Sequence, residues 1–137
     1  MDKNTLSPFL LSPFLRRVFA ADALLCIVTG LLFWLGAGLL ENLLQLPAAL
    51  LRPLGMFLVP YGALIALLAT RTHAPRWAMW AAIIVNMLWA VDSFVLLASG
   101  WVQPNALGTA FVIFQAVVVA GFALLQYMGL RQQVAIA

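Results

Sequence analysis

Charged residues are scarce in this chain, and their scarcity excludes a water-soluble domain. Asp, Glu, Lys and Arg make up 8% of the 137 residues, while hydrophobic residues make up 66%. A soluble domain covers its surface with about 25% charged residues, so this chain cannot present a solvated exterior. The class that remains is an integral membrane protein, whose outer surface contacts lipid.

The residues that most catalytic and cofactor sites need are also missing. His73 is the single histidine and Cys26 the single cysteine, which excludes a bis-histidine haem, a Cys-x-x-Cys motif and an internal disulfide. The few acids have no zinc-ligand spacing, and no glycine-rich phosphate loop is present. We therefore expect no enzyme, no catalytic residue, no metal and no cofactor. Because membrane topology accounts for the basic residues, we expect no nucleic-acid partner.

Four apolar runs are long enough to cross a bilayer. A helix needs about 20 apolar residues to span about 30 Å of hydrocarbon. The sequence predicts a single domain over residues 1–137, an all-α bundle of four transmembrane helices. The predicted spans cover about 18–39, 53–70, 77–99 and 106–130. The first run is longer than a signal-peptide core, so we expect it to be kept as a span.

The segments before and between the first two spans carry prolines. Residues 1–17 form a predicted N-terminal tail with a tandem Leu-Ser-Pro-Phe-Leu repeat at 6–10 and 11–15. Its two prolines prevent a regular helix across the repeat, which either lies in the headgroup layer or is a loosely ordered tail. Residues 41–52 are amphipathic and too short to span. They predict a short interfacial helix between the first two spans.

Basic residues gather on one side of the predicted bundle. Arg52 lies on the other side, whereas the first side holds Lys3, Arg16, Arg17, Arg71, Arg76 and Arg131. Cytoplasmic segments of membrane proteins carry an excess of Lys and Arg. This asymmetry predicts that both termini face the cytoplasm, an N-in/C-in topology.

The first span carries one carboxylate. Asp22, Cys26 and Thr29 share one face when residues are placed at 100° intervals, and polar groups within spans tend to face the bundle interior. Asp22 lies about one turn inside the predicted cytoplasmic edge. It is either a proton- or cation-binding carboxylate, or an interfacial carboxylate within reach of Arg16, Arg17 or a cytoplasmic loop.

The third span carries a wider polar arc. Asn86 lies near the predicted midplane, and Trp89, Asp92 and Ser93 continue the arc toward the outer side. Either these residues line a small cavity open to the outer side, or they have structural roles. In the second case Asn86 forms a hydrogen bond to another helix and Asp92 pairs with Arg52.

The fourth span completes a set of predicted polar layers. Gln115 and Gln126 share a face, with Gln115 near the midplane. Depth alone predicts that Asp22 lies beside Gln126 or Tyr127, and that Asn86 lies beside Gln115. The outer layer contains Glu41, Arg52 and Asp92. The candidate ligand or interior polar residues are Asp22, Asn86, Trp89, Asp92, Ser93, Gln115 and Gln126.

Four segments in the second half carry a resemblance to known proteins. They are Asn86-Met87-Leu88-Trp89-Ala90, Ser99-Gly100-Trp101-Val102, Ala106-Leu107-Gly108-Thr109-Ala110-Phe111 and Gln126-Tyr127-Met128-Gly129-Leu130-Arg131. Here the chain resembles small, uncharacterised bacterial inner-membrane proteins with four helices. The resemblance implies a multi-pass protein of the bacterial cytoplasmic membrane, and it brings no substrate or cofactor. A looser likeness to small four-helix multidrug-resistance transporters rests on Asp22 alone, and we do not carry their function over.

Two functions stay open from the sequence. The first is a small non-enzymatic membrane protein that binds a lipid or a hydrophobic small molecule, or acts as an accessory subunit. The second is an oligomeric small transporter or channel that uses Asp22 or Asp92. The expected partners are membrane lipids together with a second copy of the chain or a larger membrane complex.

Overall fold

The computed structural model describes residues 8–136, so Lys3 and the first part of the predicted tail lie outside the described residues. The elements in chain order are β1 (Pro8–Leu10), α2 (Pro13–Leu35), α3 (Ala37–Leu44), α4 (Ala48–Thr70), β2 (His73–Pro75), α5 (Arg76–Ser99) and α6 (Ala106–Ile136). Four helices, α2, α4, α5 and α6, are long and apolar enough to cross a membrane. The predicted all-α bundle with four membrane-spanning helices is confirmed.

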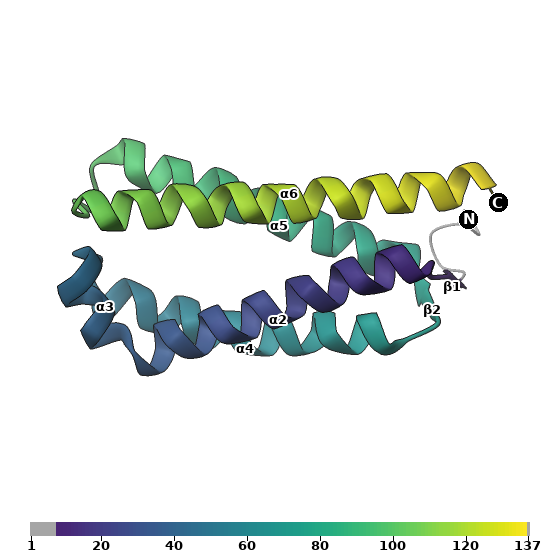
Figure 1. Ribbon diagram of the computed structural model, residues 1–137, viewed down its shortest axis with the longest axis horizontal. Helices are drawn as coiled ribbons and strands as arrows, with labels where there is room; N and C mark the ends of the chain where they lie inside the picture. Colours follow the sequence, from purple (N-terminus) through teal and green to yellow (C-terminus); the bar gives the residue numbers. More distant parts are fainter. Residues whose placement is uncertain (1–7, 137) are drawn as a thin grey trace.

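The four long helices form two antiparallel pairs (Figure 1). Helix α2 packs along α4, and α5 packs along α6. The strands and the C-terminal end of α6 lie at one end of the bundle, while α3 and the α5–α6 connection lie at the other. The two ends of the described chain therefore lie at the same end of the bundle. We call this end the strand end and the opposite end the α3 end.

Helix α2 begins earlier and ends earlier than the predicted first span. The Oγ of Ser12 accepts a hydrogen bond from the backbone N–H of Leu15 at 3.2 Å, which caps the helix. Pro13 occupies the first turn, where its missing N–H has no cost. The second proline of the repeat thus starts the helix. At its other end α2 stops at Leu35, and Gly36 separates it from α3.

The short helix between the first two spans is present but shifted toward the N-terminus. Helix α3 ends before Gln45, whose φ of 57° lies in the left-handed region. Pro47 then precedes α4 and does not interrupt a helix. Glu41 Oε2 accepts a hydrogen bond from the backbone N–H of Ala48 at 2.6 Å, which satisfies one donor at the start of α4. Helix α4 therefore begins five residues before the predicted span.

A small antiparallel strand pair closes the strand end, and the sequence did not predict it. Phe9 lies opposite Ala74, and Pro8 lies opposite Pro75. The N–H of Leu11 continues the pairing with a 2.8 Å hydrogen bond to the carbonyl of Thr72. Strands of three residues that contain proline carry no period-two pattern. The pairing joins the N-terminal segment to the α4–α5 connection.

Two buried apolar clusters lie toward the two ends of the bundle. The one at the strand end includes Leu15, Phe19 and Met79, and the one at the α3 end includes Phe33 and Leu51.

Within the first pair, α2 and α4 approach closely because small residues face each other. A Cβ atom on Gly55 would lie 2.5 Å from the carbonyl oxygen of Gly30 and 2.6 Å from the backbone nitrogen of Trp34. Such close backbone packing is how membrane helices associate without a hydrophobic driving force between them.

This contact predicts that Gly55→Ala destabilises the bundle. The added methyl group would press on the backbone of α2, and overpacking of this kind costs about 1–3 kcal/mol. The free energy of unfolding can be measured by titration with SDS in mixed micelles. Gly121→Ala is the matched control, since a Cβ atom there would meet nothing within 4 Å. Equal stability of the two variants would contradict the close α2–α4 contact.

Candidate functional site

Asp22 lies at the centre of a buried polar cluster that joins three helices. The side chain is 1% exposed. Its Oδ2 accepts hydrogen bonds from Asn86 Nδ2 of α5 at 2.9 Å and from Gln126 Nε2 of α6 at 2.8 Å. Asn86 Nδ2 also donates to Gln126 Oε1 at 3.1 Å. The three side chains form a closed set of contacts between α2 and the α5–α6 pair.

The structure buries Asp22 away from the two arginines that the interfacial alternative named as its neighbours. The carboxylate is 1% exposed and bonds to Asn86 and Gln126. The predicted contact with Arg16 or Arg17 is therefore wrong. Arg16 Nε donates instead to the carbonyl of Ala69 at 3.2 Å, and Arg17 is exposed.

The predicted pairing of Asp22 with Gln126 is present, and Tyr127 takes no part in it. Tyr127 packs against Trp80 with ring centroids 5.7 Å apart. Among the described residues, the hydrogen-bond partners of Asp22 are two amides and the thiol of Cys26, whose Sγ lies 3.5 Å from Oδ1. A carboxylate within a membrane-spanning helix is thus surrounded by neutral donors.

Asn86 and Gln115 do not pair with each other, which corrects the predicted central layer. Gln115 Oε1 accepts a hydrogen bond from Trp89 Nε1 at 2.7 Å, and its Nε2 donates to Ser93 Oγ at 2.9 Å. Helices α5 and α6 are antiparallel, so Gln115 lies level with Trp89 and Ser93, which are one and two turns beyond Asn86. The depths estimated from the sequence were too coarse to resolve this offset.

Glu41, Arg52 and Asp92 belong to segments toward the α3 end, as the predicted outer layer requires, but they do not bond to one another. Glu41 bonds to the start of α4, and no ion pair joins Arg52 to Asp92 in the described part of the chain. Both of these side chains are exposed. Asp92 and Ser93 border a surface groove between α5 and α4, with Leu50 and Leu54 on the α4 side.

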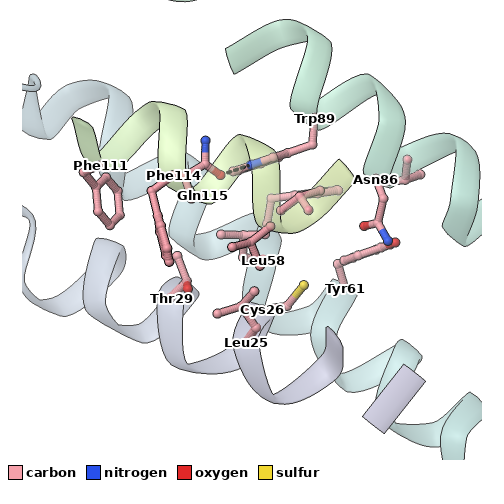
Figure 2. A pocket seen from close by; sticks show the side chains of 14 residues that line it. Leu25, Cys26, Thr29, Leu58, Tyr61, Asn86, Trp89, Phe111, Phe114 and Gln115 are labelled. Atoms are coloured by element: carbon pink, nitrogen blue, oxygen red, sulfur yellow. Dashed lines mark hydrogen bonds between the residues drawn. The ribbon is translucent and has the colours of Figure 1, made fainter. Parts of the chain in front are cut away.

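A cavity of about 150 Å³ lies between the two helix pairs (Figure 2). Its walls are mainly apolar and are contributed by all four long helices. The aromatic residues among them are Phe57, Tyr61, Trp89, Phe111 and Phe114. Figure 2 shows the Trp89–Gln115 hydrogen bond on one wall, with Cys26 and Thr29 of α2 facing it across the space.

The cavity and the polar cluster are contiguous. Cys26 and Asn86 line the cavity, and both also bond to Asp22. Asn86 and Gln115 therefore border one interior space, as predicted, although they do not bond to each other. Helix α4, the second predicted span, also contributes to the walls. The sequence analysis did not assign this helix to the site, because the span contains no amide or acid. The signal it offered was Tyr61, whose hydroxyl donates to the carbonyl of Ala82 at 3.5 Å.

The site contains no cluster of metal ligands within the described residues. No group of three or more His, Cys, Asp or Glu side chains lies close enough to hold an ion.

In comparisons with protein families, curated proteins and solved structures, nothing matches this chain. The geometry of the cavity and of the polar cluster is therefore the basis for assigning a function.

The shared acceptor predicts strong coupling between Asn86 and Gln126. Each substitution, Asn86→Ala or Gln126→Ala, should lower the free energy of unfolding by about 1–3 kcal/mol, because it leaves buried polar atoms unsatisfied. Both amides bond to Oδ2 of Asp22 and to each other, so the double variant should differ from the sum by at least about 0.5 kcal/mol.

The matched control pairs Asn86→Ala with Ser99→Ala. The hydroxyl of Ser99 bonds to the carbonyl of Leu96 in its own helix, so these two effects should add. Additive losses for Asn86 and Gln126 in the same SDS titration would show that they do not act as one cluster.

Proposed function

We propose that this integral membrane protein binds a small hydrophobic molecule, or the end of a lipid acyl chain, in the cavity between its two helix pairs. The observation that carries the proposal is the 150 Å³ space with mainly apolar walls. An apolar cavity of about this size stays dry in water-soluble proteins and accepts a molecule such as benzene. Because the site lies within four apolar spans, such a ligand would enter it from the surrounding lipid.

The few polar groups on the wall support a preferred orientation of the ligand. Binding sites for small molecules combine apolar walls with a small number of placed polar groups. Here Asn86 offers polar atoms at one end of the space, and Phe111 and Phe114 offer flat apolar surfaces at the other end, beside Thr29. A ligand with one polar atom and a compact apolar body fits this distribution.

The bonding of Asp22 supports a role without catalysis. Its Oδ2 already accepts two amide hydrogen bonds, and its Oδ1 contacts a thiol. A general base needs a free acceptor within hydrogen-bond reach of the substrate. Binding without chemistry, or service as an accessory subunit of a membrane complex, agrees with a carboxylate engaged in holding helices together.

Transport is the second candidate, and the burial of Asp22 is the observation that favours it. Ionisable residues within membrane spans often belong to ion or proton pathways, and the described partners of this carboxylate are all neutral. The adjoining cavity would be an intermediate binding site on such a pathway. Proton-driven flux in proteoliposomes that Asp22→Asn abolishes would favour transport over binding.

The proposed location is the bacterial cytoplasmic membrane with the strand end facing the cytoplasm. Arg16, Arg17, Arg71, Arg76 and Arg131 belong to segments at this end, whereas Arg52 is near the α3 end. An excess of basic residues marks the cytoplasmic side.

This orientation predicts the labelling of two introduced cysteines. In a Cys26→Ser background, a membrane-impermeant thiol reagent added to intact cells should label Gln103→Cys and leave His73→Cys unlabelled. Permeabilised cells should give labelling at both positions. Labelling of His73→Cys alone in intact cells would mean that the orientation is reversed.

The cavity predicts that a bulky side chain on its wall blocks binding. Benzene added to the protein in micelles should shift the indole N–H resonance of Trp89 saturably, because Trp89 lines the cavity. Val118 lines it too, so Val118→Phe should abolish the saturable shift. Trp77 and Trp101 are 59% and 83% exposed, so their indole N–H resonances serve as the reference for benzene that only partitions into the micelle.

The neighbouring residue supplies a matched control. Val117 is 58% exposed on the outer surface of α6, so Val117→Phe should bind benzene as the unmodified protein does. The proposed site would be contradicted if the unmodified protein showed no saturable Trp89 shift. It would also be contradicted if Val118→Phe and Val117→Phe gave equal shifts.

A further inference from the structure

Asp92 is exposed at a depth where lipid is a poor environment for a carboxylate. It lies seven residues before the end of α5 at Ser99, which places its Cα about 10 Å from the helix end. Helix α5 has 24 residues and is a few ångströms longer than the hydrocarbon layer of about 30 Å. Asp92 therefore lies below the headgroups, and a charged side chain there is costly unless a partner meets it.

Arg52 is the complementary group at the same end of the bundle. It is exposed on α4, four residues after the helix begins at Ala48 and hence about 6 Å from that end. Its guanidinium sits on a long flexible side chain, which covers the remaining difference in depth. The other arginines of the described chain belong to segments at the strand end.

Arg52 cannot meet Asp92 of its own chain. The groove beside Asp92 is lined on the α4 side by Leu50 and Leu54. Arg52 is two residues from each of them, which is a rotation of about 200° around the helix. Helix α4 itself therefore lies between the guanidinium and the groove.

We propose that two copies of this chain associate side by side in the membrane, in the same orientation, and that Arg52 of each copy pairs with Asp92 of the partner subunit. In a two-fold interface each contact occurs twice, so two ion pairs form together. Each pair removes one acid and one base from contact with lipid. Exposed apolar side chains adjoin each charge: Met56 lies one turn from Arg52 on α4, and Val95 lies three residues from Asp92 on α5, and they are 55% and 56% exposed.

A second copy fits this surface better than a lipid does. The ammonium group of a phospholipid lies in the headgroup layer, above the depth of Asp92, so a lipid offers a phosphate to Arg52 but no cation to Asp92. Another copy in the same orientation brings both complementary charges at matching depths. This interface lies on the outside of α4 and α5, so the inference is independent of ligand binding in the cavity.

Cysteine cross-linking in native membranes tests the contact directly. In a Cys26→Ser background, one tagged copy carries Arg52→Cys and a differently tagged copy carries Asp92→Cys. A bis-maleimide whose length matches an Arg–Asp pair should give a cross-linked heterodimer, since the Cα atoms of such a pair are too far apart for a disulfide. Leu35→Cys with Leu107→Cys is the control at the same end, since these residues are 76% and 60% exposed on α2 and α6. A yield of Arg52–Asp92 heterodimer no higher than this control overturns the proposal.

Charge exchange tests the energetics, with dimer dissociation followed by energy transfer as labelled protein is diluted in liposomes. Arg52→Asp or Asp92→Arg alone should raise the dissociation constant by about thirtyfold or more, the usual scale for a desolvated interfacial charge pair. The double exchange should restore association. If the exchanged single variants fail to insert, Arg52→Gln and Asp92→Asn remove the same pair without like charges and should weaken the dimer as well.

Two results of the dilution experiment would overturn the proposal. One is an unmodified protein that is monomeric at every dilution, which would leave lipid or another protein as the partner of Asp92. The other is a dimer whose dissociation constant does not respond to these substitutions, which would place the interface elsewhere.

Discussion

The contact between the Asp22 carboxylate and two amides is the constraint on which the arrangement of the two helix pairs depends. Oδ2 accepts from Asn86 at 2.9 Å and from Gln126 at 2.8 Å, and all three side chains are buried. A hydrogen bond between membrane helices contributes about 0.6 kcal/mol on average, so the set adds modest stability. Its larger effect is on register, because sliding α2 by one turn would take the buried Asp22 carboxylate away from both of its amide donors.

The cavity follows from where the two helix pairs are joined and where they are not. At the strand end an apolar cluster fills the space between them, and at the α3 end Asn105 Nδ2 donates to the carbonyl of Leu43 at 2.8 Å. Between these points Gln115 bonds to Trp89 and Ser93, and these contacts stay within the α5–α6 pair. Because its polar atoms are satisfied within the α5–α6 pair, Gln115 makes no described hydrogen bond to α2 or α4, and a space remains beside it.

The sequence predicted the helices well and their side-chain partners only in part. Spans could be found because apolar runs of sufficient length have few other uses. Helix ends were less certain, since Pro13 and Pro47 are compatible both with a turn and with the start of a helix. The face that Asp22 shares with Cys26 and Thr29 was also correct. The partner of Asn86 was wrong because periodicity gives the direction of a side chain but not the axial offset between neighbouring helices.

The two carboxylates of the spans illustrate what sets the limit of prediction. Both are aspartates, and one acquires its hydrogen-bond donors from within the chain while the other lies on the surface of α5. Asp22 finds amides because α5 and α6 each present one at its depth. Asp92 has no such donor among the described residues, and the arginine at its end of the bundle lies on the far side of α4. Opposite charges at similar depth are therefore insufficient evidence of a pair within one chain. The rotation of each helix decides whether the contact is internal or is left for another molecule in the membrane.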